Sequence, residues 1–116
     1  MGQLTTHVLD LTAGLPAAGV RVELHAQTPA GPRLLAAATT GPDGRVAALL
    51  SGAEFKTGTY LLTFHTAEYF RARGVRLPEP AFLELASIQI GIAAADQHYH
   101  VPLLIAPWSY SVYRGG

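Results

Sequence analysis

Three histidines stand where the β-strand pattern of the sequence places them outside the hydrophobic core. Side chains alternate between the two faces of a strand, so His7 faces away from the apolar side of a strand predicted over 4–10. His98 and His100 likewise lie opposite the apolar series of a strand predicted over 99–105. A neutral imidazole can accept a proton near neutral pH, so these residues are candidates for acid–base chemistry.

The outer faces of these strands carry leucine, hydroxyl and imidazole groups but no lysine or glutamate. The last predicted strand, 109–114, adds Ser111 and Tyr113 to this semi-polar type of face. Such a face suits an intersubunit cleft with apolar walls and a few convergent polar groups. The alternative is a solvated sheet face with incidental histidines, and the strand pattern alone leaves both interpretations open. His25 and His65 have no matching partner and are interpreted as ordinary sheet residues.

His98 and His100 are two residues apart on one strand and could converge on a metal ion. The chain has no cysteine, and no carboxylate accompanies the pair at a known ligand spacing. A His-x-His pair alone is a weak metal signal. We therefore expect neither a metal nor another cofactor.

The composition predicts a chain without a strongly charged surface. Lys plus Arg and Asp plus Glu number eight each, and the basic residues are scattered, which predicts no binding to nucleic acid or acidic membranes. Charged residues make up 14% of the 116 residues and hydrophobic residues 49%, so we expect an oligomer with buried faces. The length predicts one domain over 1–116, and the first residues lack the pattern of a signal peptide, which favours the cytoplasm.

Short β-rich segments separated by turn signals run through the chain, as is typical of a sandwich or barrel. The segment GPDG at 41–44 has strong turn chemistry, because its proline and glycines suit the backbone angles of a tight turn. One short helix is predicted over 66–74, where arginines precede a glycine stop. The eight predicted strands are 4–10, 20–26, 33–39, 45–49, 58–65, 83–92, 99–105 and 109–114. This pattern predicts an all-β antiparallel β-sandwich of two sheets with one helix.

Four motifs in order carry a family resemblance. They are LTTHVLD at 4–10, PDGR at 42–45, HYHVPLL at 98–104 and YSVYRGG at 110–116. Together they resemble the 5-hydroxyisourate hydrolases, the transthyretin-related enzymes of urate breakdown, over essentially the whole chain. The resemblance implies a transthyretin-like sandwich of two four-stranded sheets. It also implies a homotetramer whose central channel holds active sites where two dimers meet.

The resemblance places the family's functional residues on this chain, position by position. They are His7, Arg45 and His100 for catalysis, His7, Arg45 and Tyr113 for substrate binding, and His98, Ser111 and Arg114 at the edge of the site. Without the resemblance, an arginine directly after a turn would be interpreted as a solvated side chain. The family ending YRGS is YRGG here, so Gly116 stands where the family has a serine hydroxyl.

The implied reaction is hydrolysis of the ring amide of 5-hydroxyisourate, giving 2-oxo-4-hydroxy-4-carboxy-5-ureidoimidazoline. Water is the nucleophile, so we expect His7 and His100 to share the general-base and proton-transfer work, with their order left open. Arg45 would bind the substrate and stabilise developing negative charge. One alternative is a transthyretin-like carrier of small ligands, which has no need of paired histidines and an arginine. The other is a structural sandwich module, which would normally belong to a longer secreted chain.

Overall fold

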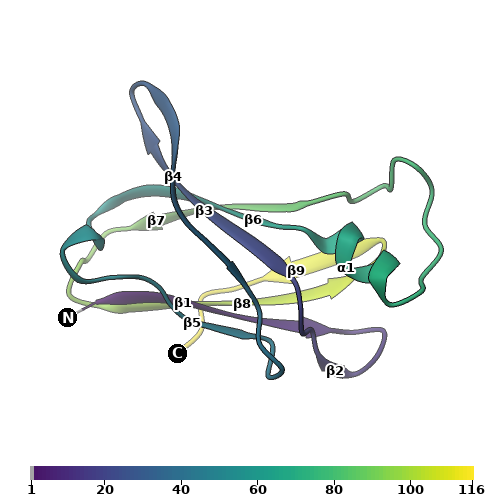
Figure 1. The fold of residues 1–116 in the computed structure, drawn as a ribbon. Helices are drawn as coiled ribbons and strands as arrows, with labels where there is room; N and C mark the ends of the chain where they lie inside the picture. Colours follow the sequence, from purple (N-terminus) through teal and green to yellow (C-terminus); the bar gives the residue numbers. More distant parts are fainter. Residues whose placement is uncertain (1) are drawn as a thin grey trace.

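A computed structural model describes residues 2–116 and shows two β-sheets packed face to face, with one short helix beside them (Figure 1). The first sheet has the order β2-β1-β8-β9, and β5 also pairs with β1. Its strands are β1 (Gln3–Asp10), β2 (Leu15–Pro16), β5 (Arg45–Ser51), β8 (His98–Ala106) and β9 (Ser109–Val112). The second sheet has the order β4-β3-β6-β7. Its strands are β3 (Arg21–Thr28), β4 (Gly31–Thr39), β6 (Gly58–Phe64) and β7 (Ala86–Ile92).

The strands β1 and β8 run parallel, and the other strand pairs of the described residues are antiparallel. Parallel neighbours require a long crossover connection, because the chain must return to the end at which it started. Here the connection includes the whole second sheet and the helix. The prediction of antiparallel strands therefore holds for every described strand pair except β1 and β8.

The core lies between the two sheets and follows the predicted alternation. Along β1, burial alternates residue by residue, and along β8 the apolar series that begins at Tyr99 is buried. The fully buried side chains from the two sheets include Leu4, Leu24, Leu62, Phe64, Leu103 and Ile105. His7 and His100 are half-buried on the opposite face, as the sequence predicts.

The helix α1 (Thr66–Ala72) is attached to the first sheet through a buried carboxylate. Asp10 ends β1 and accepts hydrogen bonds from the Tyr69 hydroxyl at 2.9 Å and from the Thr12 hydroxyl at 2.6 Å. Burial raises the pKa of Asp10, but the hydrogen bonds from Thr12, Tyr69 and the Ala13 amide outweigh it and leave this pKa below its usual value. Burial and the hydrogen bond to the carboxylate raise the pKa of Tyr69 to about 12.

The predicted elements are present, with differences at their ends. The helix stops at Ala72, and a short 3₁₀ turn, η1 (Gly52–Glu54), follows β5. The two-residue strand β2 lies outside the eight predicted strands and makes the first sheet five-stranded. The strand predicted from residue 83 begins at Ala86, because Glu84 is turned toward α1, where its carboxylate accepts a hydrogen bond from Arg71. No helix of the described residues is long and apolar enough to cross a membrane.

Candidate functional site

The strand β1 brings together residues from three distant parts of the sequence. His7 lies directly opposite Arg45 of β5 on one side of β1. Thr5 lies directly opposite His100 of β8 on the other side, and His98 stands two residues earlier on β8. These five side chains belong to the face of the first sheet that points away from the core, because cross-strand neighbours share a face.

A tight turn holds Arg45 against this strand. The carboxylate of Asp43 accepts a hydrogen bond from the Arg45 backbone N–H at 3.0 Å, and the Gly44 carbonyl accepts one from Val8 of β1 at 2.8 Å. Gly44 has a φ of 76°, and a Cβ at this position would collide with the Val8 carbonyl oxygen. Only glycine allows this conformation and this close approach, so the PDG sequence fixes where Arg45 leaves the turn.

An open hollow of about 490 Å³ lies over these strands. Its polar side chains include Thr5, Asp43, Arg45, His98 and His100, and Gly116 borders it from the C-terminal segment. That segment returns toward β5 and β8 after β9 (Figure 1). The described residues therefore place two histidines, an arginine and a threonine around one space large enough for a small bicyclic molecule.

His7 lies beside the lining of this hollow, near His100. The two imidazole rings are 6.4 Å apart between centroids and are tilted by only 29°. His98 also approaches His100, with 6.3 Å between ring centroids. Burial lowers the pKa of His100, and the positive charge of Arg45 and the neighbouring His7 and His98 lower this pKa further. These effects favour the neutral form of His100, in which one ring nitrogen can accept a proton.

Thr5 was not among the residues selected from the sequence. Its hydroxyl lies 2.7 Å from Nδ1 of His100 and 2.9 Å from Nε2 of His98. The available signal was the alternation of β1, which places Thr5 on the same face as His7. The pairing with β8 was the missing information, because a sequence pattern does not give the register between strands 95 residues apart.

Gly115 is a second residue that the sequence analysis did not select. Its backbone N–H donates a hydrogen bond to the His100 carbonyl at 2.7 Å and forms an isolated bridge to β8. A Cβ at this position would lie 2.7 Å from Cδ2 of the His100 ring and 3.1 Å from Cγ of Pro102. Because Gly115 has no side chain, the C-terminal segment can approach the His100 imidazole this closely.

The other residues predicted for the site lie outside this hollow within one chain. Tyr113 is 59% exposed and lines a second hollow of about 250 Å³ together with Arg114. The Arg114 guanidinium lies 4.0 Å from the centre of the Tyr99 ring. Ser111 pairs with Leu104 of β8, so it shares the outer face of that strand without lining either hollow.

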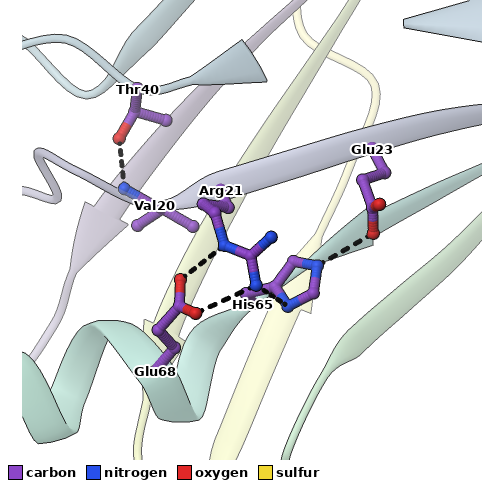
Figure 2. A network of polar contacts seen from close by, with 6 residues as sticks. All are labelled: Val20, Arg21, Glu23, Thr40, His65 and Glu68. Atoms are coloured by element: carbon purple, nitrogen blue, oxygen red, sulfur yellow. Dashed lines mark hydrogen bonds and ion pairs between the residues drawn. The ribbon is translucent and has the colours of Figure 1, made fainter. Parts of the chain in front are cut away.

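His65 belongs to a separate polar network at the junction of β3 and α1. Figure 2 shows Arg21 making a two-pronged ion pair with Glu68, with nitrogen–oxygen distances of 2.7 and 2.9 Å. Arg21 also donates to Nδ1 of His65, so the Nε2–H of that ring donates to Glu23. His25 lies on β3 of the same sheet. Both histidines lie away from the hollow, and His25 is a sheet residue as predicted, whereas His65 lies between β6 and α1.

Within residues 2–116, no group of three or more His, Cys, Asp or Glu side chains is arranged to hold a metal ion. His98 and His100 both direct a ring nitrogen at the Thr5 hydroxyl. The imidazoles at the hollow can transfer protons, and the Arg45 guanidinium can bind an anionic or carbonyl-rich molecule.

Comparison with known proteins gives a consistent result. The model of the HIUase/Transthyretin family matches residues 4–115. The protein 5-hydroxyisourate hydrolase 2 of Rhizobium meliloti (strain 1021) is 53% identical over 115 residues, which cover 98% of this chain and 96% of that protein.

Two solved structures are similar over nearly the whole chain. The crystal structure of (S)-allantoin synthase superposes with a TM-score of 0.91 at 43% identity, over 99% of this chain and 44% of that one. The chain thus spans less than half of that protein. The structure of Klebsiella pneumoniae 5-hydroxyisourate hydrolase superposes with a TM-score of 0.84 at 36% identity and covers all of both chains.

Proposed function

The chain belongs to the HIUase/Transthyretin family, and we propose that it hydrolyses 5-hydroxyisourate to 2-oxo-4-hydroxy-4-carboxy-5-ureidoimidazoline at the hollow beside β1, β5 and β8. The observation that carries this proposal is a half-buried His100 with Arg45 and His7 as its neighbours, which together with burial lower its pKa. We propose that residues 1–116 act as one hydrolase domain without a cofactor, and that the protein works in the cytoplasm.

His100 is the general base in this mechanism. Its pKa is lowered by burial and by Arg45, so its unprotonated form predominates at neutral pH. It takes a proton from a water molecule as the water oxygen attacks the carbonyl carbon of the ring amide. General bases of this kind contribute typically 10²- to 10⁴-fold in rate.

Arg45 and His7 hold the substrate and its developing charge. The guanidinium presents several N–H donors in one plane, which suits the oxygens of a urate-like ring and the oxyanion that forms at the attacked carbon. His7 of β1 lies directly opposite Arg45 of β5, and we assign it to substrate binding and to a hydrogen bond with the leaving nitrogen. His7 thereby holds the leaving nitrogen in place while His100 gives it the proton.

Assembly into a homotetramer is part of the proposal, because three expected site residues lie outside the hollow of one chain. Tyr113 would bind substrate, and Ser111 and Arg114 would support the edge of a site that two subunits form. Exposed apolar side chains support this assembly, with Phe82 at 71% and Trp108 at 60% exposure. Light scattering should give a mass of four chains, and a dissociated protein should lose its turnover.

A ligand carrier is the alternative function. A carrier needs a channel of suitable shape but no neutral imidazole beside a guanidinium. The two functions differ in one measurement, because a carrier would bind 5-hydroxyisourate or other ring compounds without accelerating hydrolysis.

The test is the decay of freshly generated 5-hydroxyisourate with and without protein. The substrate decays unaided, so the rate without protein is the reference. His7→Ala, Arg45→Ala and His100→Ala should each lower turnover strongly, whereas His65→Ala removes an imidazole far from the hollow and serves as the matched control. An unchanged decay rate with the wild-type protein would exclude the hydrolase. Full activity in all three site variants would exclude the site.

A further inference from the structure

The Thr5 hydroxyl is shared by two imidazole rings. It lies 2.7 Å from His100 Nδ1 and 2.9 Å from His98 Nε2, and both distances are within hydrogen-bond range. A hydroxyl has one proton to donate and can accept from a second group. It therefore cannot donate to both rings, and when both are neutral it accepts from one ring and donates to the other.

Two arrangements satisfy this geometry when both imidazoles are neutral. In the first, His98 donates from Nε2 to Thr5, Thr5 donates to Nδ1 of His100, and the proton of His100 is on Nε2. In the second, His100 donates from Nδ1 to Thr5, and Thr5 donates to Nε2 of His98. Only the second arrangement leaves Nε2 of His100 with a free lone pair, which a general base requires.

We propose that Thr5 is a positioning residue that couples His100 to His98, keeping the lone pair of His100 on Nε2 and relaying to His98 the proton equivalent that His100 gains. This inference rests on the hydrolase function proposed above. It adds a specific role for His98, which the family resemblance places only at the edge of the site, and for a threonine with no assigned role.

The relay restores the starting protonation of both histidines over one catalytic cycle. As water attacks, an O–H bond breaks and an N–H bond forms at Nε2 of His100, which becomes an imidazolium. The Nδ1 proton then passes to the Thr5 oxygen while the Thr5 proton passes to Nε2 of His98. His100 is neutral again and His98 carries the charge. The same path runs in reverse when Nε2 of His100 gives its proton to the leaving nitrogen, so the starting arrangement is restored.

The surroundings of the two rings favour moving the charge outward. His100 is half-buried and lies next to His7 and near the permanent charge of Arg45, whereas His98 is exposed to solvent. A positive charge on His100 is destabilised by its burial and by Arg45. The relay carries that charge to the ring that water can solvate, while the transferred protons each move only the length of one hydrogen bond.

Two substitutions at Thr5 separate this role from packing. Thr5→Val keeps the shape and removes the hydroxyl, whereas Thr5→Ser keeps the hydroxyl and removes a methyl group. We expect Thr5→Val to lower kcat by about 10-fold or more, with less effect on KM, since the base loses its oriented tautomer. Thr5→Ser should retain most of the turnover. Circular dichroism and light scattering show whether each variant remains folded and assembled.

The pH dependence of kcat/KM distinguishes the proposed role of Thr5 from a packing role, because a loss of packing alone would not shift it. The Thr5 oxygen accepts from Nδ1–H of protonated His100 and so favours the charged form. Thr5→Val should therefore lower the pKa of His100 and shift the acid limb of kcat/KM to lower pH. Thr5→Ser should leave this limb in place.

Nitrogen-15 NMR of the histidine rings tests the tautomers without any substrate. In the wild-type protein at a pH where both rings are neutral, we expect His100 protonated on Nδ1 and His98 unprotonated on Nε2. A His100 protonated on Nε2 would overturn the proposal whatever the activity. The NMR measurement tests the relay alone. The substrate assay with wild-type protein tests the hydrolase function, so the two proposals can fail separately.

A double-mutant cycle completes the test. His98→Ala removes the other end of the relay, so its effect on kcat should overlap with that of Thr5→Val. The double variant should then be little worse than either single variant, because residues that act as one unit are not additive. Fully multiplicative effects on kcat, or an unchanged kcat and pH limb in Thr5→Val, would overturn the coupling.

Discussion

Replacing Gly115 with alanine adds one methyl group where the C-terminal segment crosses His100. The new Cβ would lie 2.7 Å from Cδ2 and 3.3 Å from Cγ of the imidazole. Ordinary contact begins at 3.4 Å, so the ring or the segment must move by 0.7 Å, the difference between 3.4 and 2.7 Å. Both movements cost energy. The ring is hydrogen-bonded to the Thr5 hydroxyl at 2.7 Å, and the backbone N–H of Gly115 donates to the His100 carbonyl at 2.7 Å.

The size of the effect follows from that displacement. Thr5 and Gly115 flank His100 on opposite sides of β8, so the added methyl group would push the ring toward Thr5, against a hydrogen bond that is already 2.7 Å long. Overpacking of this kind costs about 1–3 kcal/mol, and each 1.36 kcal/mol in the barrier is tenfold in rate. A misplacement near 1 Å in an active site can cost about 100-fold. We therefore expect Gly115→Ala to lower kcat by about 10- to 100-fold.

The assay is the decay of freshly generated 5-hydroxyisourate, followed with matched protein concentrations and melting temperatures. Gly91→Ala is the control, because a Cβ at that exposed strand position has nothing within 4 Å. We expect the control to keep the wild-type rate and melting temperature, and Gly115→Ala to melt at a lower temperature but to remain folded at the temperature of the assay. If Gly115→Ala turns over at the wild-type rate, then the contact between the C-terminal segment and His100 does not support catalysis.

Three further predictions concern the charge around His100, the buried carboxylate and the chain end. Arg45→Ala should raise the pKa of His100, because a neighbouring positive charge is removed, and an NMR titration of the ring should show its protonation shifted to higher pH. Asp10→Ala should destabilise the protein by roughly 1–3 kcal/mol in urea unfolding, because it leaves the buried Tyr69 hydroxyl without its acceptor. The pKa of Asp10 is depressed in the folded state, so this stabilisation is present above the unfolded pKa, about 3.9, and is lost as the pH falls through the lower folded pKa. Equal free energies of unfolding for wild type and Asp10→Ala at neutral pH would contradict this prediction. Gly116→Ser should leave turnover similar or raise it modestly, and a large rise would show that the hydroxyl is needed.

The burial pattern of single strands was predictable from the sequence, because it depends on the local alternation of side chains. Leu4 and Val8 are buried as predicted, and His7 lies on the opposite face. The turn before Arg45 was also predictable, since it depends on a proline and glycines that are adjacent in sequence. These features need no knowledge of which strands are neighbours.

The pairing of strands was not predictable in the same way. The sequence offers no local signal that β1 lies between β5 and β8, or that β1 and β8 run parallel. The role of Thr5 depends on both facts, so its hydroxyl could not be distinguished from that of any other strand threonine. Gly115 was missed for a related reason, because its need for a hydrogen side chain arises from contact with a ring on another strand.

The parallel pair explains why the site tolerates so little change in register. A shift of one residue between β1 and β8 would turn His100 toward the core and expose Val101, because the side-chain period of a strand is two. A shift of two residues would keep His100 outward but place it opposite His7 or Gln3 instead of Thr5. The burial of the apolar face therefore excludes the first shift, and only specific contacts can exclude the second. The hydroxyl shared between two imidazoles is such a contact, so the group that we assign to proton transfer also helps to fix the strand register that creates the site.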